Sequence, residues 1–214
     1  MKTFCSTLIM ACCVAAVTRA EVVNFEDAET GKAPAGWTAT QTGEGQAEWR
    51  VITDESAPSK PNVLAQLGQA KFPICLKENT KLRNGFVEVK FKPVSGKADQ
   101  AGGVVWRALD ENNYYIARAN ALENNVVLYK TVNGKRTALD IVGRTGGYGV
   151  EAKVPSGQWH TLRVEFENNR FTLYYNGNKL FDVVDETFTE PGKVGVWTKA
   201  DSVTFFDDFS YGSK

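Results

Sequence analysis

The stretch HTLRVEFENNRFTLYYNGNKLFDVVD (residues 160–185) contains three short segments in which apolar and polar side chains alternate. Alternation of this kind is typical of half-buried β-strands, because successive side chains of a strand point to opposite faces. Asn168-Asn169 and Asn176-Gly177 separate the segments, and such residues tolerate the positive φ angles of tight hairpin turns. The stretch therefore predicts three successive antiparallel strands.

Similar short runs, alternating or β-branched, recur along the chain, and almost no segment shows the apolar period of an amphipathic helix. The predicted strands are Val22–Glu26, Trp49–Thr53, Leu64–Leu67, Ile74–Leu76, Phe86–Lys92, Gly103–Ala108, Tyr114–Ala119, Val126–Val132, Leu139–Val142, His160–Glu167, Arg170–Asn176, Lys179–Asp185, Val194–Thr198 and Val203–Tyr211. Without crossover helices, the pattern indicates one all-β domain, a two-sheet antiparallel jelly-roll sandwich. A closed barrel is the structural alternative.

The period of two also predicts which side chains form the core. The residues expected to face inward are Val87, Val89 and Phe91 in one strand and Leu162, Val164 and Phe166 in another. Asn133-Gly134 predicts a further tight hairpin.

The N-terminal segment has the composition of a secretory signal peptide. Lys2 precedes an apolar run that reaches Val17, and Thr18-Arg19-Ala20 is a small-x-small cleavage pattern. We expect cleavage after Ala20, which leaves residues 21–214 as a single secreted domain, periplasmic or extracellular. The run is too short for a membrane-spanning helix of about 20 apolar residues. Lipid anchoring at Cys12 is a second interpretation.

Charge and cysteine content restrict the partners. The chain has 25 basic and 25 acidic residues, with both signs interspersed, so no basic surface that would attract nucleic acid is predicted. Three of the four cysteines precede Ala20, so the mature domain has Cys75 alone and cannot form an internal disulfide. Cys75 lies in an apolar segment, which favours a buried thiol. We expect a monomer without a transmembrane segment.

Signatures of catalysis are sparse. His160 is the only histidine, so a zinc site is not expected, and the interpretation favoured for this residue is a strand-edge side chain bonded by its neighbours. Neither a Gly-x-Ser-x-Gly elbow nor a phosphate-binding glycine loop is present. Glu165 and Glu167 share a strand face and could form the carboxylate pair of a glycosidase. The favoured interpretation is a solvated outer face that includes Arg163.

The stretch AGGVVWRALDENNYYIARAN (residues 101–120) offers a chemistry that suits sugars. It brings Trp106, Arg107, Asn113, two tyrosines and Arg118 onto neighbouring strands. Aromatic rings cover the apolar faces of pyranoses, while Arg and Asn hydrogen-bond hydroxyl or carboxylate groups. The alternative is that Trp106 and one tyrosine belong to the core and that the arginines pair with Asp110 and Glu111.

This stretch, together with VVLYK (residues 126–130) and PGKVGVWTKADSVTFFDDF (residues 191–209), resembles the concanavalin-A-like lectin/glucanase superfamily. The resemblance is strongest to secreted bacterial domains of the 3-keto-disaccharide-hydrolase-like, laminin-G-like type. It extends from the opening NFED (residues 24–27) with Gly36-Trp37 to the last strand, but the Glu-x-Asp-x-x-Glu strand of laminarinase-like glucanases is absent.

The resemblance implies a carbohydrate ligand in a cleft on the concave sheet. The residues assigned to ligand binding are Trp106, Arg107, Asn113, Tyr115, Arg118, Lys130, Trp197, Lys199 and Asp201. The first hypothesis is a carbohydrate-binding module. The alternative is a glycan hydrolase or lyase, acting on 3-keto disaccharides or polysaccharides, with Asp201 or Glu123 in proton transfer. A structural or protein-binding module of the envelope is the third.

No cofactor is expected, apart from one candidate metal site. Glu26-Asp27 and Asp207-Asp208 belong to the first and last strands, which usually lie side by side in this sandwich. Carboxylates suit calcium, so Glu26 and Asp207 are its candidate ligands. The interpretation favoured over calcium is that these acids cap strand ends or pair with lysines.

Overall fold

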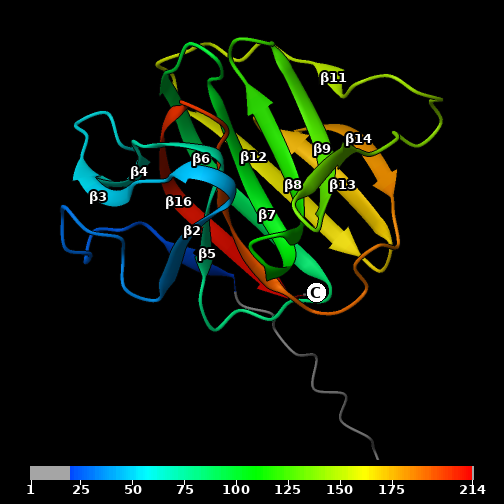
Figure 1. Cartoon of the computed structure of the whole chain (residues 1–214), viewed down its shortest axis with the longest axis horizontal. Helices are drawn as coiled ribbons and strands as arrows, with labels where there is room; N and C mark the ends of the chain where they lie inside the picture. Colours follow the sequence, from blue (N-terminus) through cyan, green and yellow to red (C-terminus); the bar gives the residue numbers. More distant parts are fainter. Residues whose placement is uncertain (1–19, 214) are drawn as a thin grey trace, which may run out of the picture.

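The computed structural model describes residues 20–213, which fold into two antiparallel eight-stranded sheets packed face to face. Figure 1 looks onto one of them, here called the front sheet, with the back sheet behind it. In order, the front sheet contains β10 (Lys135–Ala138), β9 (Asn125–Val132), β8 (Asn113–Asn120), β7 (Ala101–Asp110), β15 (Lys193–Trp197), β5 (Gln69–Lys77) and β2 (Trp37–Gln46), with β11 (Val150–Glu151) on β9. The back sheet contains β14 (Asn178–Val184), β13 (Arg170–Tyr175), β12 (His160–Glu167), β6 (Gly85–Ser95), β16 (Val203–Ser213), β4 (Asn62–Gln66) and β3 (Trp49–Thr53), with β1 (Glu21–Val23) on β16.

This architecture confirms the predicted all-β jelly-roll sandwich, and the barrel alternative is wrong because the two sheets remain separate. The strands predicted at Trp49–Thr53 and His160–Glu167 have the observed bounds. The predicted hairpins also form: Asn133 and Gly134 join β9 to β10 with φ angles of 48° and 75°. Both angles are positive, as this type of two-residue turn requires.

One predicted strand is wrong, and three observed strands, β2, β10 and β11, were not predicted. Leu139–Val142 is not a strand, because only Ile141 pairs there, in an isolated bridge to Val183, and the segment connects the two sheets. The edge strand Trp37–Gln46 was not predicted, since its sequence is rich in polar residues and glycine and lacks a clear apolar alternation. Residues 1–19, which hold most of the predicted signal peptide and Cys12, lie outside the described part of the chain.

The core lies between the sheets and follows the predicted alternation. All six side chains predicted to face inward are fully buried there. Trp106 stacks on Tyr115 at 5.4 Å and packs against Phe166 and Phe171 of the back sheet. Cys75 is buried in the same core as a free thiol, and burial raises its pKa. The described residues contain no helix that is long and apolar enough to span a membrane.

The front sheet curls strongly toward its outer face. Thr42 on β2 and Tyr114 on β8 are four strand positions apart, which in a flat sheet would separate them by about 19 Å. Their hydroxyl oxygens instead lie 2.8 Å apart in a hydrogen bond. The outer face of the front sheet is therefore concave, and it carries a second apolar cluster that includes Phe72, Ile116 and Trp197.

Candidate functional site

Seven polar side chains come together on the concave face and form what we call the concave-face cluster. Its members are Asp99, Arg118, Asn120, Glu123, Tyr129, Tyr148 and Lys199. They come from the end of β8, from β9 and from the loops that border them. Buried polar groups are uncommon on the face of a sheet unless they are paired or functional. The cluster is therefore the candidate functional site.

Arg118 is the centre of the cluster, with a side chain that is 0% exposed. It donates to Asn125 Oδ1 at 2.6 Å and, at 2.9 Å each, to Glu123 Oε2 and to the hydroxyl groups of Tyr129 and Tyr148. Burial lowers the pKa of Arg118, but the neighbouring tyrosines and Glu123 raise it by more, so the net shift is upward. The guanidinium is therefore charged, and its Nε alone has no partner.

The two carboxylates of the cluster share one amide. Asn120 Nδ2 donates to Asp99 Oδ1 at 2.6 Å and to Glu123 Oε1 at 3.1 Å. Because both oxygens bond the same nitrogen, the distance between them cannot exceed the sum of these two distances. That upper limit is comparable with the carboxylate spacing of about 5–5.5 Å in retaining glycosidases. Burial raises the pKa of Glu123, but hydrogen bonding and the charge of Arg118 lower it more. Glu123 is thus ionised.

Lys199 and a loop complete the pairing of charges. Lys199 Nζ lies 2.6 Å from Asp99 Oδ2, so the two cations and two carboxylates of the cluster balance. Asp99 belongs to the loop between β6 and β7. The Asp201 carboxylate holds this loop in shape, because it accepts hydrogen bonds from the backbone N–H groups of Lys97, Ala98 and Asp99. Burial raises the pKa of Asp201, but these hydrogen bonds together lower it more, and the net shift is downward.

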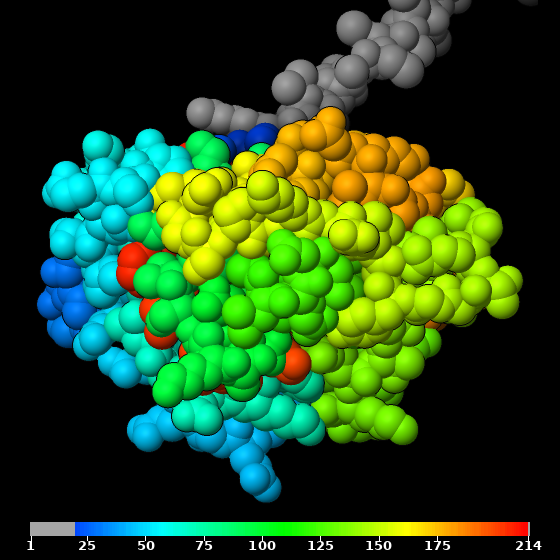
Figure 2. All heavy atoms as spheres, turned by 90° about the horizontal axis from the view of Figure 1, so that it is seen from above, coloured from blue at the N-terminus to red at the C-terminus, as the bar shows by residue number. Residues whose placement is uncertain are grey.

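Tyr148 reaches Arg118 from the long loop between β10 and β11. In the view of Figure 2, the yellow-green segment that includes this loop lies against the green segment that ends β8. The next residue, Gly149, has φ +59°, and a Cβ there would lie 2.3 Å from the carbonyl oxygen of Val126. Only glycine lets the loop approach β9 so closely. The Tyr148 side chain is half exposed and covers the buried guanidinium.

Of the sequence-predicted site residues, Arg118, Trp197 and Lys199 share the concave face. Trp197 is buried there, and its indole N–H donates to Tyr114. Trp106 and Tyr115 lie on the opposite side of the front sheet, in the core, because Tyr115 and Arg118 are three residues apart in one strand and so point to opposite faces.

The remaining predicted residues have structural contacts elsewhere. Arg107 is 1% exposed and donates to the carbonyl oxygens of Arg83, Phe188 and Asn168, so it does not pair with Asp110 or Glu111. Lys130 pairs with Asp185 at 2.7 Å. Asn113 bonds Asp110 and the backbone of Asn133 in the turns at that end of the sheet.

The other sequence hypotheses can be located as well. His160 bonds the carbonyl oxygen of Pro155 and the hydroxyl of Tyr175, which confirms the interpretation as a strand-edge histidine. Arg163 pairs with Glu165 at 3.0 Å on the back sheet, far from the concave-face cluster in the fold.

The candidate calcium ligands are both engaged with donors of the protein. Asp207 accepts the N–H and O–H of Ser59, and Glu26 accepts the N–H of Asn62. Within residues 20–213, no group of three or more His, Cys, Asp or Glu side chains could hold a metal. Calcium at this pair stays a prediction, to be tested by melting the protein with and without a chelator.

Sequence reasoning overlooked Asp99, Asn120, Tyr129 and Tyr148. For Tyr129 a signal existed: the β8–β9 hairpin pairs Arg118 with Val127 and Ile116 with Tyr129, which puts Tyr129 on the face of Arg118 and its neighbour Lys130 on the other. The loop positions of Asp99 and Tyr148 have no comparable periodic signal.

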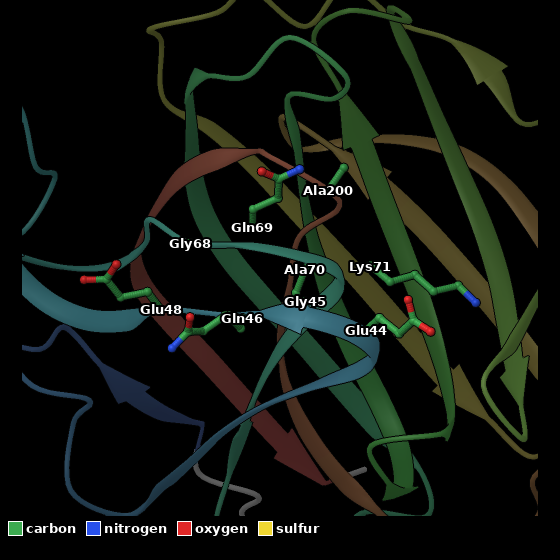
Figure 3. A pocket seen from close by; sticks show the side chains of 10 residues that line it. Glu44, Gly45, Gln46, Glu48, Gly68, Gln69, Ala70, Lys71 and Ala200 are labelled. Atoms are coloured by element: carbon green, nitrogen blue, oxygen red, sulfur yellow. The ribbon is translucent and has the colours of Figure 1, made fainter.

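A pocket of about 990 Å³ lies beside the cluster, between the β2–β3 and β4–β5 turns. Figure 3 shows Gly45, Gly68 and Ala70 among its lining residues, with Glu48 at the end away from Lys71. Ala200, which follows Lys199, also lines it. The pocket offers room for a ligand next to the cluster, and the buried charged side chains belong to the cluster itself.

Comparison with known proteins identifies the family. The model of the 3-keto-alpha-glucoside-1,2-lyase-like domain matches residues 22–209. The chain belongs to this family. A search of the curated proteins finds no match.

Solved structures agree on the fold. The carbohydrate-binding module CBM66 from Bacillus subtilis is similar with a TM-score of 0.64 and 18% identity, over 85% of this chain and 97% of that one. A native glycosidic hydrolase gives a TM-score of 0.53 and 12% identity over 92% and 97% of the chains. A Bacillus subtilis protein of unknown function with a galectin-like fold gives 0.54 and 11% over 82% and 88%. At these identities the likeness establishes the jelly-roll sandwich alone.

Proposed function

We propose that this domain binds a carbohydrate on its concave face, with the concave-face cluster as the contact site. The observation that carries the proposal is Arg118, a fully buried charge held by four side chains on the outer face of a sheet. The core between the sheets does not require such a group there. Its partners hold it in place beside polar atoms that solvent can reach.

The exposed parts of the cluster match the chemistry of a sugar. Tyr148 offers a half-exposed ring, which can cover the apolar C–H face of a pyranose. The side chains of Glu123 and Lys199 are 34% and 28% exposed, so their charged groups can accept from and donate to hydroxyl groups. The structural neighbour CBM66 is a carbohydrate-binding module, which supports the same ligand class.

A panel of immobilised glycans tests the proposal. The protein, expressed with its own leader, should be retained by at least one glycan, and Tyr148→Ala or Lys199→Met should reduce that retention about tenfold or more. Arg163→Met on the back sheet is the matched control, because it also removes a half-buried, ion-paired cation. Equal retention of the cluster variants and the wild type would contradict the proposal.

Catalysis is the second candidate function, favoured by the close approach of Asp99 and Glu123 and by the lyase-like description of the family. In a 3-keto-glucoside the ketone acidifies the neighbouring C2 proton. A base that removes this proton lets the C1–O bond break as the C1=C2 double bond forms. Glu123 is the candidate base because it is ionised, partly exposed and close to Asp99, whereas the Asp201 carboxylate holds the backbone N–H groups of the β6–β7 loop.

Incubation with 3-keto disaccharides, followed by mass spectrometry of the products, separates the two functions. A lyase releases an unsaturated sugar that is lighter by one water than the saturated 3-keto sugar released by a hydrolase, and a binding module leaves the disaccharide intact. Glu123→Gln should abolish turnover while the fold is kept, if the enzyme hypothesis holds.

We also propose that the N-terminal segment acts as a leader that directs the domain to export. Sequencing the N-terminus of protein from the periplasmic or culture fraction tests it, with Glu21 as the expected first residue.

A further inference from the structure

Arg136 on β10 is a cation that has no ionic partner in the described part of the chain. It lies on the concave face, where its guanidinium carbon is 4.3 Å from the ring centre of Tyr129, 4.7 Å from that of Phe72 and 5.4 Å from that of Trp197. Within residues 20–213 its guanidinium forms no ion pair and no hydrogen bond, and Nη1 is buried without a partner. Three aromatic rings therefore hold a charge whose N–H groups are unused.

This arrangement differs from that of the other enclosed arginines. Arg107 donates to three carbonyl groups, and Arg118 and Arg163 pair with carboxylates. Cation–π contacts of about 0.5–2 kcal/mol can hold Arg136 in position, but they do not satisfy its donors. A half-buried guanidinium with free donors is prepared to bind an acceptor from outside the chain.

The residues around Arg136 are positively charged, which favours a negatively charged acceptor. A pocket of about 460 Å³ is lined by Lys71, Phe72, Asn133, Gly134, Lys135 and Arg136, three cations and no carboxylate. Lys71 and Lys135 are exposed and form no ion pair within the described residues. Glu44 lines the neighbouring pocket together with Lys71 but forms no ion pair with it (Figure 3). The local charge is positive, whereas the charges of the concave-face cluster balance.

We propose that this pocket, which we call the basic pocket, binds the anionic group of an acidic glycan, a carboxylate or a sulfate ester. The planar guanidinium of Arg136 can donate two parallel hydrogen bonds to two oxygens of such a group, and Lys71 and Lys135 add charge at the rim. Phe72 provides an apolar floor for the sugar ring. The inference rests on the proposed function and specifies its ligand class.

Tyr129 connects the two sites. Its ring stacks under Arg136, while its hydroxyl accepts from Arg118. The basic pocket and the concave-face cluster are thus one side chain apart on the same face. An oligosaccharide can contact both, with a neutral part at the cluster and an acidic group at Arg136.

Matched polymers test the inference. Retention would be measured on polygalacturonate and its fully methyl-esterified form, and on dextran sulfate and unmodified dextran. The first pair identifies a carboxylate and the second a sulfate ester. The wild type should prefer the acidic member of at least one pair about tenfold, and added salt should weaken that preference. Arg136→Met, which keeps apolar contact with the rings, should remove it, with melting temperature as the check on folding.

Arg163→Met is the matched control, because Arg163 also stacks on an aromatic ring, 3.9 Å from the centre of Phe86, but on the back sheet. Equal loss in both variants, or equal binding of acidic and neutral polymers, would overturn the basic pocket. In the second case carbohydrate binding itself would stand. If Arg136→Met loses binding and Tyr148→Ala does not, the basic pocket stands and the cluster proposal falls. A wild type that binds no polymer, and whose melting temperature millimolar galacturonate leaves unchanged, would overturn both.

Discussion

Two buried arginines, Arg107 at one end of the sandwich and Arg118 on the concave face, have nearly the same exposure and very different surroundings. Arg107 donates only to backbone carbonyl oxygens of the segments around it. Arg118 donates only to side chains, one of them the ionised Glu123. Burial alone therefore does not mark a functional residue. The kind of partner does, because backbone acceptors fix loops whereas side chains at a surface can be shared with a ligand.

The pKa values of the two groups show the same contrast. Burial lowers the pKa of Arg107, and the nearby tyrosine offsets this only in part. At Arg118 the effect of burial is outweighed by Tyr129, Tyr148 and Glu123. The first arginine depends on dipoles of the fold, and the second on a set of titratable side chains.

Replacing Arg107 should have the largest effect on stability. Arg107→Met leaves carbonyl groups of Arg83, Phe188 and Asn168 without their donor, and we expect the free energy of unfolding to fall by about 3 kcal/mol or more. Denaturant titration measures the loss. Glycan retention by the fraction that remains folded should be unchanged, and a selective loss of retention would show that the comparison has the two roles reversed.

Arg118→Met should destabilise less, by about 2 kcal/mol, because water can reach Glu123 and replace part of the lost hydrogen bonding. Retention on the glycan that the wild type prefers should fall at least tenfold. The measurement pairs denaturant titration with retention on the same preparation. A variant that keeps full retention would break the functional half of the comparison.

Sequence alone predicted the fold because alternation and hairpin turns are local signals. Val87 and Phe166 are buried where their strand period puts them, and Asn133-Gly134 turns where its φ preference requires. The site was predicted only in part. Arg118 and Lys199 were found from their residue types, but Trp106 and Tyr115 were grouped with them although they point to the core.

The missing residues depend on contacts between distant segments. Tyr148 meets Arg118 across 30 positions of sequence, and Arg136 meets Phe72 only because the front sheet curls. Curvature is a property of the whole sheet that no single strand pattern contains. Hairpin register was the one available signal, and it would have found Tyr129.

Tyr148 separates a contact of the ring from a contact of the hydroxyl group. Tyr148→Phe removes the acceptor for Arg118, but the residue is half exposed, so we expect a loss of only about 0.5 kcal/mol in unfolding free energy. Glycan retention should change little in Tyr148→Phe and fall several-fold in Tyr148→Ala, since the ring covers the sugar. Thermal melts and retention on the glycan panel check both values; equal retention by the two variants would remove the ring from the site.

The smallest expected effect is a change of stability in acid. It should arise at Arg118 and not at Arg107, because only Arg118 has a carboxylate partner that titrates. The pKa of Glu123 lies below its ordinary value of about 4.3, so its contribution to stability is complete above that pH and is lost as the pH falls through the folded-state pKa. The contribution should be below about 1 kcal/mol, since a third of the side chain is exposed. The difference in unfolding free energy between wild type and Glu123→Gln should therefore shrink on acidification from pH 6 toward pH 3. The same series in Arg118→Met should show no such shrinkage, because the cation that lowers the pKa is gone; a constant difference in the wild-type background would mean that Glu123 is not held by Arg118 in solution.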